Sequence, residues 1–169
     1  MVWNTNSYER AEALRQLEGL VDIYLPDLKY ADDGLARAYS AAPGYFETAT
    51  AAILEMRRQV GADVLDVDGV MRRGMIVRHL VLPGCRKDSH RVLDWVRANL
   101  GPDVRVSLLW QYTPLYRAAE VKALNRRVTS FEYEDVVDYF FAIGLQNGYR
   151  QGKEAATAAW TPDFNLRGV

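Results

Sequence analysis

Three groups of polar residues in this sequence lie where predicted β-strands end. Asn4-Thr5-Asn6 follows a first strand-like run, Asp27 and Lys29 follow a second, and Arg78 and His79 lie late in a third. In parallel α/β folds, ligands bind at the carboxyl ends of the strands, where side chains far apart in sequence meet. Amides, a hydroxyl, a carboxylate, an ammonium and a guanidinium together suit a small zwitterionic ligand that carries hydroxyl groups.

Each group also has a purely structural interpretation. Asn4-Thr5-Asn6 contains residue types that cap helices. Asp27 and Lys29 point the same way along a strand and are placed to form a local ion pair. Arg78 and His79 are also expected as polar positions on a less buried side of a strand, and a lone histidine is more often a hydrogen-bonded structural residue than a base. The residues alone leave both interpretations open.

Lys29 supports a separate hypothesis, a Schiff-base aldolase, because a desolvated lysine at the end of a barrel strand can form an imine. The single cysteine, Cys85, excludes an internal disulfide and suggests a reducing, cytoplasmic location. One thiol cannot hold an iron–sulfur cluster, which normally needs three or four thiolates. Asp66 and Asp68 are expected to serve a turn, so no metal ligand and no catalytic residue are predicted.

The elements that would position these groups alternate between strand and helix patterns. Strand-like runs cover 2–5, 21–25, 75–82 and 104–109, and they are separated by helical patterns that begin near Ser7, after Pro43-Gly44 and at Asp88 or Ser89. A capping box at Thr129–Glu132 begins a last helix. Asp68-Gly69 predicts the turn of a β-hairpin. This alternation indicates parallel strands covered by helices.

The chain is expected to form one domain over residues 1–169, with 152–169 as a tail that wraps the surface. Of its 169 residues, 49% are hydrophobic and 25% are charged, which is typical of a soluble protein. The net charge of −1 predicts no attraction to nucleic acid or to an anionic membrane. No run of apolar residues is long enough to span a bilayer, and no signal peptide is predicted. The first strand, 2–5, is expected to be an exposed sheet edge through which the isolated chain self-associates.

Several strings occur in a fixed order along the chain. They are Asn4-Thr5-Asn6, residues 24–30 (YLPDLKY) and 77–84 (VRHLVLPG), followed by 106–114, 124–127 and 160–164. In that order and spacing they resemble the later strands of the pyruvate formate-lyase activating enzyme family of the radical S-adenosylmethionine (SAM) superfamily. The chain is most similar to a branch of uncharacterised proteins related to that family. The resemblance covers essentially the whole chain.

The resemblance implies an α/β fold, the C-terminal part of a partial (β/α)6 TIM-like barrel with parallel strands, flanking helices and a β-hairpin insertion. It implies that Asn4 and Thr5 lie near the methionyl group of SAM and an associated cation. It places Asp27 and Lys29 at the SAM ribose and carboxylate, and Arg78 matches a basic residue on the strand before Pro-Gly. In the family, a CxxxCxxC loop holds a [4Fe–4S] cluster that cleaves SAM, and the resulting radical abstracts hydrogen, often from a partner enzyme.

The chain departs from this pattern because it has neither CxxxCxxC nor a Gly-Gly-Glu strand for the SAM amino group. We therefore expect a SAM-cradling part of an activating-type enzyme, whose cluster-bearing N-terminal half acts in cis or in trans. A protein substrate is a further candidate partner. The isolated chain is expected to hold no cluster, to bind SAM weakly and to be inactive. The alternative is a non-catalytic binding or partner-docking module derived from a truncated barrel.

Overall fold

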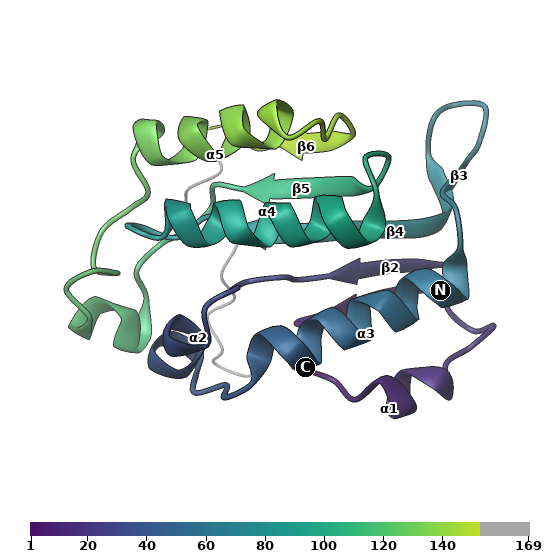
Figure 1. Cartoon of the computed structure of the whole chain (residues 1–169), viewed down its shortest axis with the longest axis horizontal. Coiled ribbons are helices and arrows are strands. Elements are labelled where there is room, and N and C mark those ends of the chain that lie inside the picture. Colours follow the sequence, from purple (N-terminus) through teal and green to yellow (C-terminus); the bar gives the residue numbers. More distant parts are fainter. Residues whose placement is uncertain (153–169) are drawn as a thin grey trace, which may run out of the picture.

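The computed structural model describes residues 1–152, in which α3 and α4 lie across one face of a β-sheet (Figure 1). The strands are β1 (Val2–Thr5), β2 (Ile23–Pro26), β3 (Val64–Leu65), β4 (Met71–Leu80), β5 (Arg105–Leu109) and β6 (Gly148–Arg150). The helices are α1 (Ala11–Arg15), α2 (Asp33–Ser40), α3 (Tyr45–Val60), α4 (Arg86–Leu100) and α5 (Ser130–Ala142), with a 3-10 turn, η1, at Tyr116–Glu120. The tail expected from 152 onward lies outside the described residues, apart from Gly152.

The sheet follows the order β1-β2-β4-β5-β6, and every neighbouring pair in that order is parallel. Among the strands of residues 1–152, β3 alone runs antiparallel, paired with β4 as the first arm of a hairpin. In that hairpin the Asp66 carboxylate accepts hydrogen bonds from the backbone N–H groups of Asp68 and Val70. The expected α/β class, with parallel strands, flanking helices and a hairpin, is therefore confirmed.

Residues alternate along the strands between two faces of the sheet. Tyr24, Met75, Val77 and Val106 face the helices and are fully buried. Because parallel strands share a pleat, this alternation puts the residues between them on the opposite face. The covered face and the helices above it form the hydrophobic core.

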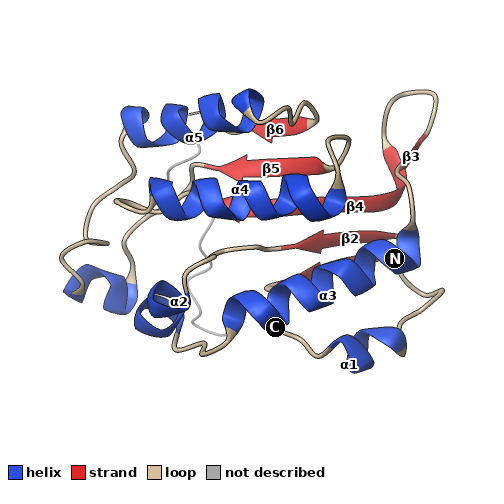
Figure 2. Cartoon of the chain, in the orientation of Figure 1, coloured by secondary structure: helices blue, strands red, loops and turns tan. Residues whose placement is uncertain are grey.

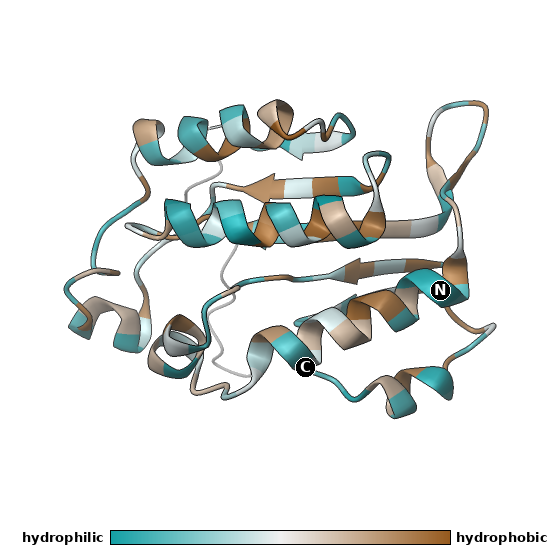
Figure 3. Cartoon of the chain, viewed as in Figure 1, coloured by the Kyte–Doolittle hydropathy of each residue, from teal (hydrophilic) through white to brown (hydrophobic). Residues whose placement is uncertain are grey.

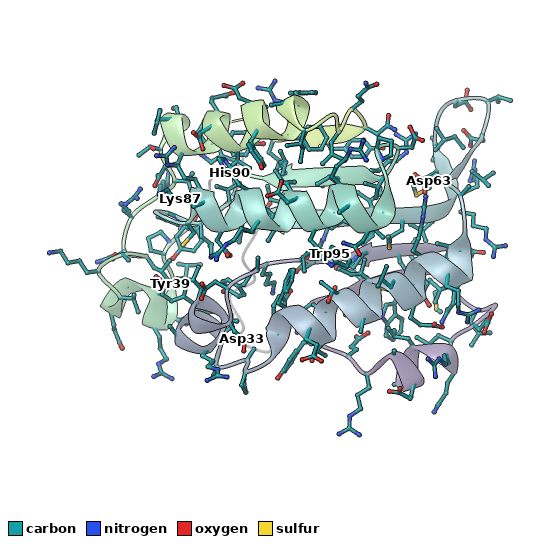
Figure 4. The ribbon with its side chains drawn as sticks, viewed as in Figure 1. Asp33, Tyr39, Asp63, Lys87, His90 and Trp95 are labelled. Carbon is teal, nitrogen blue, oxygen red and sulfur yellow. The ribbon has the colours of Figure 1, made fainter. Side chains whose placement is uncertain are left out.

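The helices that cover the sheet are amphipathic, and hydrophobic residues alternate with hydrophilic ones along α4 (Figure 3). The helix α3 begins after Gly44, whose φ of 68° suits glycine, and ends before Gly61, as the sequence predicts. Trp95 of α4 lies between α4 and α3 (Figure 4) and meets the Phe46 ring edge-on, with 6.2 Å between ring centroids. No helix within residues 1–152 is long and apolar enough to cross a membrane.

The sequence predicts some helix ends correctly and others wrongly. The capping box of α5 is present, with Thr129 and Glu132 exchanging hydrogen bonds. The expected start of α4 at Asp88 or Ser89 is wrong, because the helix begins at Arg86 and both side chains serve other contacts. The first helix is shorter than its apolar stripe suggests: it spans Ala11–Arg15, and Ser7, with a φ of 64°, lies before it and does not begin it. The short elements α2 and β6 were not anticipated.

Candidate functional site

Asp27, Lys29 and Arg78 meet at the carboxyl edge of the sheet, although 51 residues separate Asp27 from Arg78. Asp27 is the residue directly after β2, and it lies beside Arg78 of β4 in parallel register. Arg78 donates from Nε and Nη2 to Asp27 Oδ1, at 2.8 and 2.6 Å. Lys29 Nζ lies 3.5 Å from Asp27 Oδ2. Three of the expected site residues thus form one cluster with a formal charge of +1.

The geometry of this cluster leaves hydrogen-bonding capacity on its exposed side. Both Arg78 donors go to the same carboxylate oxygen, so Oδ2 of Asp27 has only the longer Lys29 contact among the described residues. The three side chains are partly exposed, at 17% for Asp27, 27% for Arg78 and 35% for Lys29. A carboxylate oxygen that can accept from hydroxyl groups therefore lies beside an ammonium that can pair with an anion.

The cluster continues across the sheet as a row of polar side chains that sequence reasoning missed. Arg78 is paired in register with Ser107 of β5, and Ser107 with Tyr149 of β6. Side chains paired in parallel register point to the same face, so two hydroxyl groups follow Arg78 on this face. An alternating serine in β5 was the only signal in the sequence, and Tyr149 gave none because β6 was not predicted.

The structure separates Asn4 from Thr5. Asn4 is exposed and pairs with Leu25, so it shares the face of Asp27 but lies one pleat earlier. Thr5 is buried on the opposite face, where its hydroxyl accepts from the Ser7 N–H and donates to Glu9 at 2.7 Å. Thr5 thus holds the turn after β1 rather than capping α1, whose N-cap is Arg10, while Asn4 remains a candidate ligand contact.

The two histidines have different environments. His79 is buried on the covered face, where Nδ1 donates to the Leu28 carbonyl at 2.7 Å and Nε2 accepts from the Ser89 hydroxyl at 2.8 Å. Burial lowers the pKa of His79, so the ring is neutral at pH 7 and structural. His90 lies on the side of α4 that faces α5 (Figure 4), stacked on Tyr139 with 3.9 Å between centroids. Neither histidine belongs to the Asp27 cluster.

A [4Fe–4S] cluster does not fit the residues of this chain. Cys85 is its single thiol, and burial raises the pKa of that thiol to about 11, which disfavours the thiolate that binds iron. Residues 1–152 also contain no group of three or more His, Cys, Asp or Glu side chains placed to hold a metal ion.

Two surface hollows of the molecule do not include the Asp27 cluster. One, with a volume of 460 Å³, lies between the end of α2 and residues 117–124, and the other, of 320 Å³, lies at the start of α4. Tyr39 lines both. Asp27, Lys29 and Arg78 line neither, so the candidate site rests on the convergence of its charges rather than on a preformed cavity.

The chain is similar in sequence to a protein that is itself uncharacterized. No protein-family model matches the chain. It is 30% identical over 142 residues to the uncharacterized protein MJ0674 of Methanocaldococcus jannaschii. The match covers 82% of this chain but 37% of that protein, so the chain spans well under half of the length of this relative.

The fold is similar to that of a solved enzyme domain. A domain of pyruvate-formate lyase-activating enzyme from Bacteroides vulgatus matches with a TM-score of 0.62, covering 89% of this chain and 80% of the solved one. At 14% sequence identity the likeness concerns the fold alone. It confirms the fold expected from the sequence resemblance.

Proposed function

We propose that this chain is the SAM-binding part of a radical SAM protein of the activating-enzyme type, and that Asp27, Lys29 and Arg78 contact the ligand. The observation that carries the proposal is the convergence of these three residues at the carboxyl ends of β2 and β4. The likeness of the fold to a domain of pyruvate-formate lyase-activating enzyme supports it.

The chemistry of the cluster matches the groups that SAM presents. Oδ2 of Asp27, which has only the 3.5 Å contact with Lys29 among the described residues, is suited to accept hydrogen bonds from ribose hydroxyls, and Lys29 is suited to pair with the methionyl carboxylate. Arg78 fixes the Asp27 carboxylate through two donors, which orients the oxygen that faces the ligand. Ser107, beside Arg78, adds a hydroxyl on the same face.

The proposal assigns the iron–sulfur cluster to a segment other than residues 1–152, in cis or in trans. The amino and carboxylate groups of SAM then lack their contacts to the cluster when this chain is alone. Each charged hydrogen bond contributes about 1.5–3 kcal/mol, so two missing contacts weaken binding by several orders of magnitude. We expect a dissociation constant in the millimolar range, equivalent to about −4 kcal/mol.

The test is an NMR titration of the isotope-labelled chain with SAM. We expect saturable shifts of the backbone amides of Asp27, Lys29 and Arg78. Asp27→Asn and Lys29→Met should abolish these shifts without unfolding the chain. Asp103→Asn and Lys122→Met make the same chemical changes at exposed positions outside the cluster and should leave the titration unchanged.

A folded chain that shows no shift in this cluster at several times the expected dissociation constant contradicts the proposal. Shifts confined to the hollows beside Tyr39 also contradict it, because they place the ligand elsewhere. A micromolar dissociation constant for the chain alone would show that contacts between SAM and an iron–sulfur cluster are not needed for binding. It would favour a self-sufficient binding module.

A further inference from the structure

The segment that carries Asp27 and Lys29 continues β2 beyond the end of its sheet pairing. The β1–β2 ladder ends where Thr5 pairs with Pro26. From Asp27 onward the chain is drawn as a loop that runs to α2 (Figure 2). Two backbone bonds persist there, from Asp27 N to the Thr5 carbonyl and from Leu28 N to the Arg78 carbonyl, each at 2.9 Å. The remaining polar groups of residues 27–29 need other partners to hold this segment in place.

Tyr45, the first residue of α3, supplies part of this pairing. Its hydroxyl accepts from Lys29 N at 3.0 Å and lies within hydrogen-bond distance of the carbonyls of Asp27, at 3.0 Å, and Asn6, at 3.1 Å. Tyr45 is 2% exposed, and burial raises its pKa, so the hydroxyl keeps its single proton and can share it between these two carbonyls. One atom thus joins the ends of β1 and β2 to the start of α3.

His79 supplies the next part. Its Nδ1 donates to the Leu28 carbonyl, the residue between Asp27 and Lys29, at 2.7 Å. The ring cannot turn away, because Ser89 holds its other nitrogen and the side chain is 2% exposed. His79 directly follows Arg78, so one strand of the sheet provides both the partner of the Asp27 carboxylate and the partner of the Leu28 backbone.

We propose that Tyr45 and His79 are positioning residues of the ligand site. Beyond the end of the β1–β2 ladder, their side chains supply hydrogen bonds that a paired strand would otherwise supply, and they fix the backbone of Asp27, Leu28 and Lys29. The proposal rests on the function proposed above for the ligand, but the fixing of the backbone is a property of the unliganded chain. Neither residue contacts the ligand, because both side chains lie on the covered face. Their effect is to hold the Asp27 carboxylate and the Lys29 ammonium at the spacing that the ligand requires.

The experiment combines amide hydrogen exchange with the SAM titration in variants of the full chain. In Tyr45→Phe, exchange at Lys29 should accelerate about tenfold relative to exchange at Val106, and SAM affinity should fall by a similar factor, as expected for one lost hydrogen bond. Val106 is a suitable reference, because it is buried in β5 and bonded to the Asn147 carbonyl. The Tyr45 ring contacts with Tyr30 and Tyr8 persist in the phenylalanine variant.

Tyr24→Phe is the matched control. Tyr24 is also a buried tyrosine whose hydroxyl has one strong partner, Gln59 Oε1 at 2.7 Å, but it lies in the part of β2 that the ladder holds. It should lose a similar amount of stability without changing the ratio of Lys29 to Val106 exchange. If Tyr45→Phe behaves like Tyr24→Phe, Tyr45 contributes only general stability and its assignment is overturned.

His79 is tested by two substitutions. His79→Leu removes the donor to Leu28, while His79→Asn keeps an N–H group close to the position of Nδ1. We expect faster Lys29 exchange and about tenfold weaker SAM binding in His79→Leu, and recovery of both in His79→Asn. Equal loosening in both variants overturns the assignment of His79. If the unmodified chain binds no SAM, the proposed function fails, but the exchange ratios still decide whether Tyr45 and His79 fix residues 27–29. If a variant loosens this segment and its SAM affinity is unchanged, the positioning role of Tyr45 and His79 is overturned.

Discussion

Neighbouring side chains on β4 meet two different environments. Val77 and His79 face the helices and are almost fully buried, whereas Arg78 between them faces the other side and is 27% exposed. The covered face holds apolar side chains and a neutral, fully hydrogen-bonded histidine. The opposite face carries the charges and hydroxyls of Asp27, Arg78 and Ser107. We infer that the opposite face provides the ligand contacts, and that the covered face mainly determines stability and acts on binding only where Tyr45 and His79 hold the backbone of residues 27–29. Substitutions at consecutive residues can test this division.

The largest effect is expected on the covered face. Val77→Ala removes two methyl groups from a fully buried site, and at about 0.8 kcal/mol for each group plus a cavity term it should lower the free energy of unfolding by about 2 kcal/mol. Urea denaturation measures this loss. The SAM titration of the folded variant should match that of the unmodified chain, and weakened binding would show that the two faces are coupled.

His79 makes the covered face sensitive to pH. Burial lowers the pKa of His79 below its ordinary value of 6.5, against the opposing effects of the Leu28 hydrogen bond and the charges of Asp88 and Asp27. The unfolded chain therefore binds a proton near pH 6.5 that the folded chain does not bind until lower pH. Stability is fully present above this value and is lost as the pH falls below it, by up to about 1.4 kcal/mol per pH unit.

The measurement compares urea denaturation of the unmodified chain and of His79→Asn between pH 8 and about pH 5. This range is chosen because it includes the ordinary histidine pKa. The difference between the two proteins should be constant above pH 7 and should shrink or reverse below pH 6.5, because asparagine does not titrate. Carboxyl groups titrate in both proteins, so their contribution cancels. A constant difference over the whole range would mean that the folded chain protonates His79 as readily as the unfolded chain.

The capping box of α5 lies outside both faces and provides a reference of intermediate size. Thr129→Ala removes the hydroxyl that accepts from Glu132 N, and caps of this kind contribute about 1 kcal/mol. Thermal unfolding should show this loss at every pH from 6 to 8. Glu132 also accepts from Gly84 N at 2.7 Å, in the turn that follows β4. A change in the Gly84 amide signal would indicate that the cap also holds this turn.

Local signals predicted much of this fold. The Gly44 and Gly61 ends of α3, the hairpin turn at Asp68-Gly69 and the α5 capping box depend on residues close together in sequence. The beginning of α4 was wrong because Asp88 and Ser89 bind partners 57 and 10 residues away, Ala31 and His79, instead of capping their own helix. A side chain with a distant partner gives no local signal.

The candidate site shows the same limit. The order of the strands made it possible to predict that Asp27, Lys29 and Arg78 would meet, because parallel strands end at one edge. The role of Tyr45 was not predictable, since an aromatic residue at the start of a helix fits an apolar stripe, and its hydroxyl finds Lys29 only after α3 packs on the sheet. The separation of Thr5 from Asn4 required knowledge of the register of β1.

The smallest effect on stability is expected at Arg78. Arg78→Met keeps the length of the side chain and removes its charge. The ion pair with Asp27 is partly exposed, and such pairs contribute up to about 1 kcal/mol, less than Val77→Ala next to it should cost. In this variant the Asp27 carboxylate still has Lys29 Nζ at 3.5 Å, and the carboxylate is partly exposed, so water can also solvate it. Binding should nevertheless be lost, because the carboxylate is no longer held by two donors and is free to turn toward Lys29.

Parallel urea denaturation and SAM titration of Val77→Ala and Arg78→Met should therefore give opposite results. A loss of stability in Arg78→Met as large as in Val77→Ala, with SAM shifts unchanged, would make the Asp27–Arg78 pair a structural link between β2 and β4 and would remove the main support for the proposed ligand site.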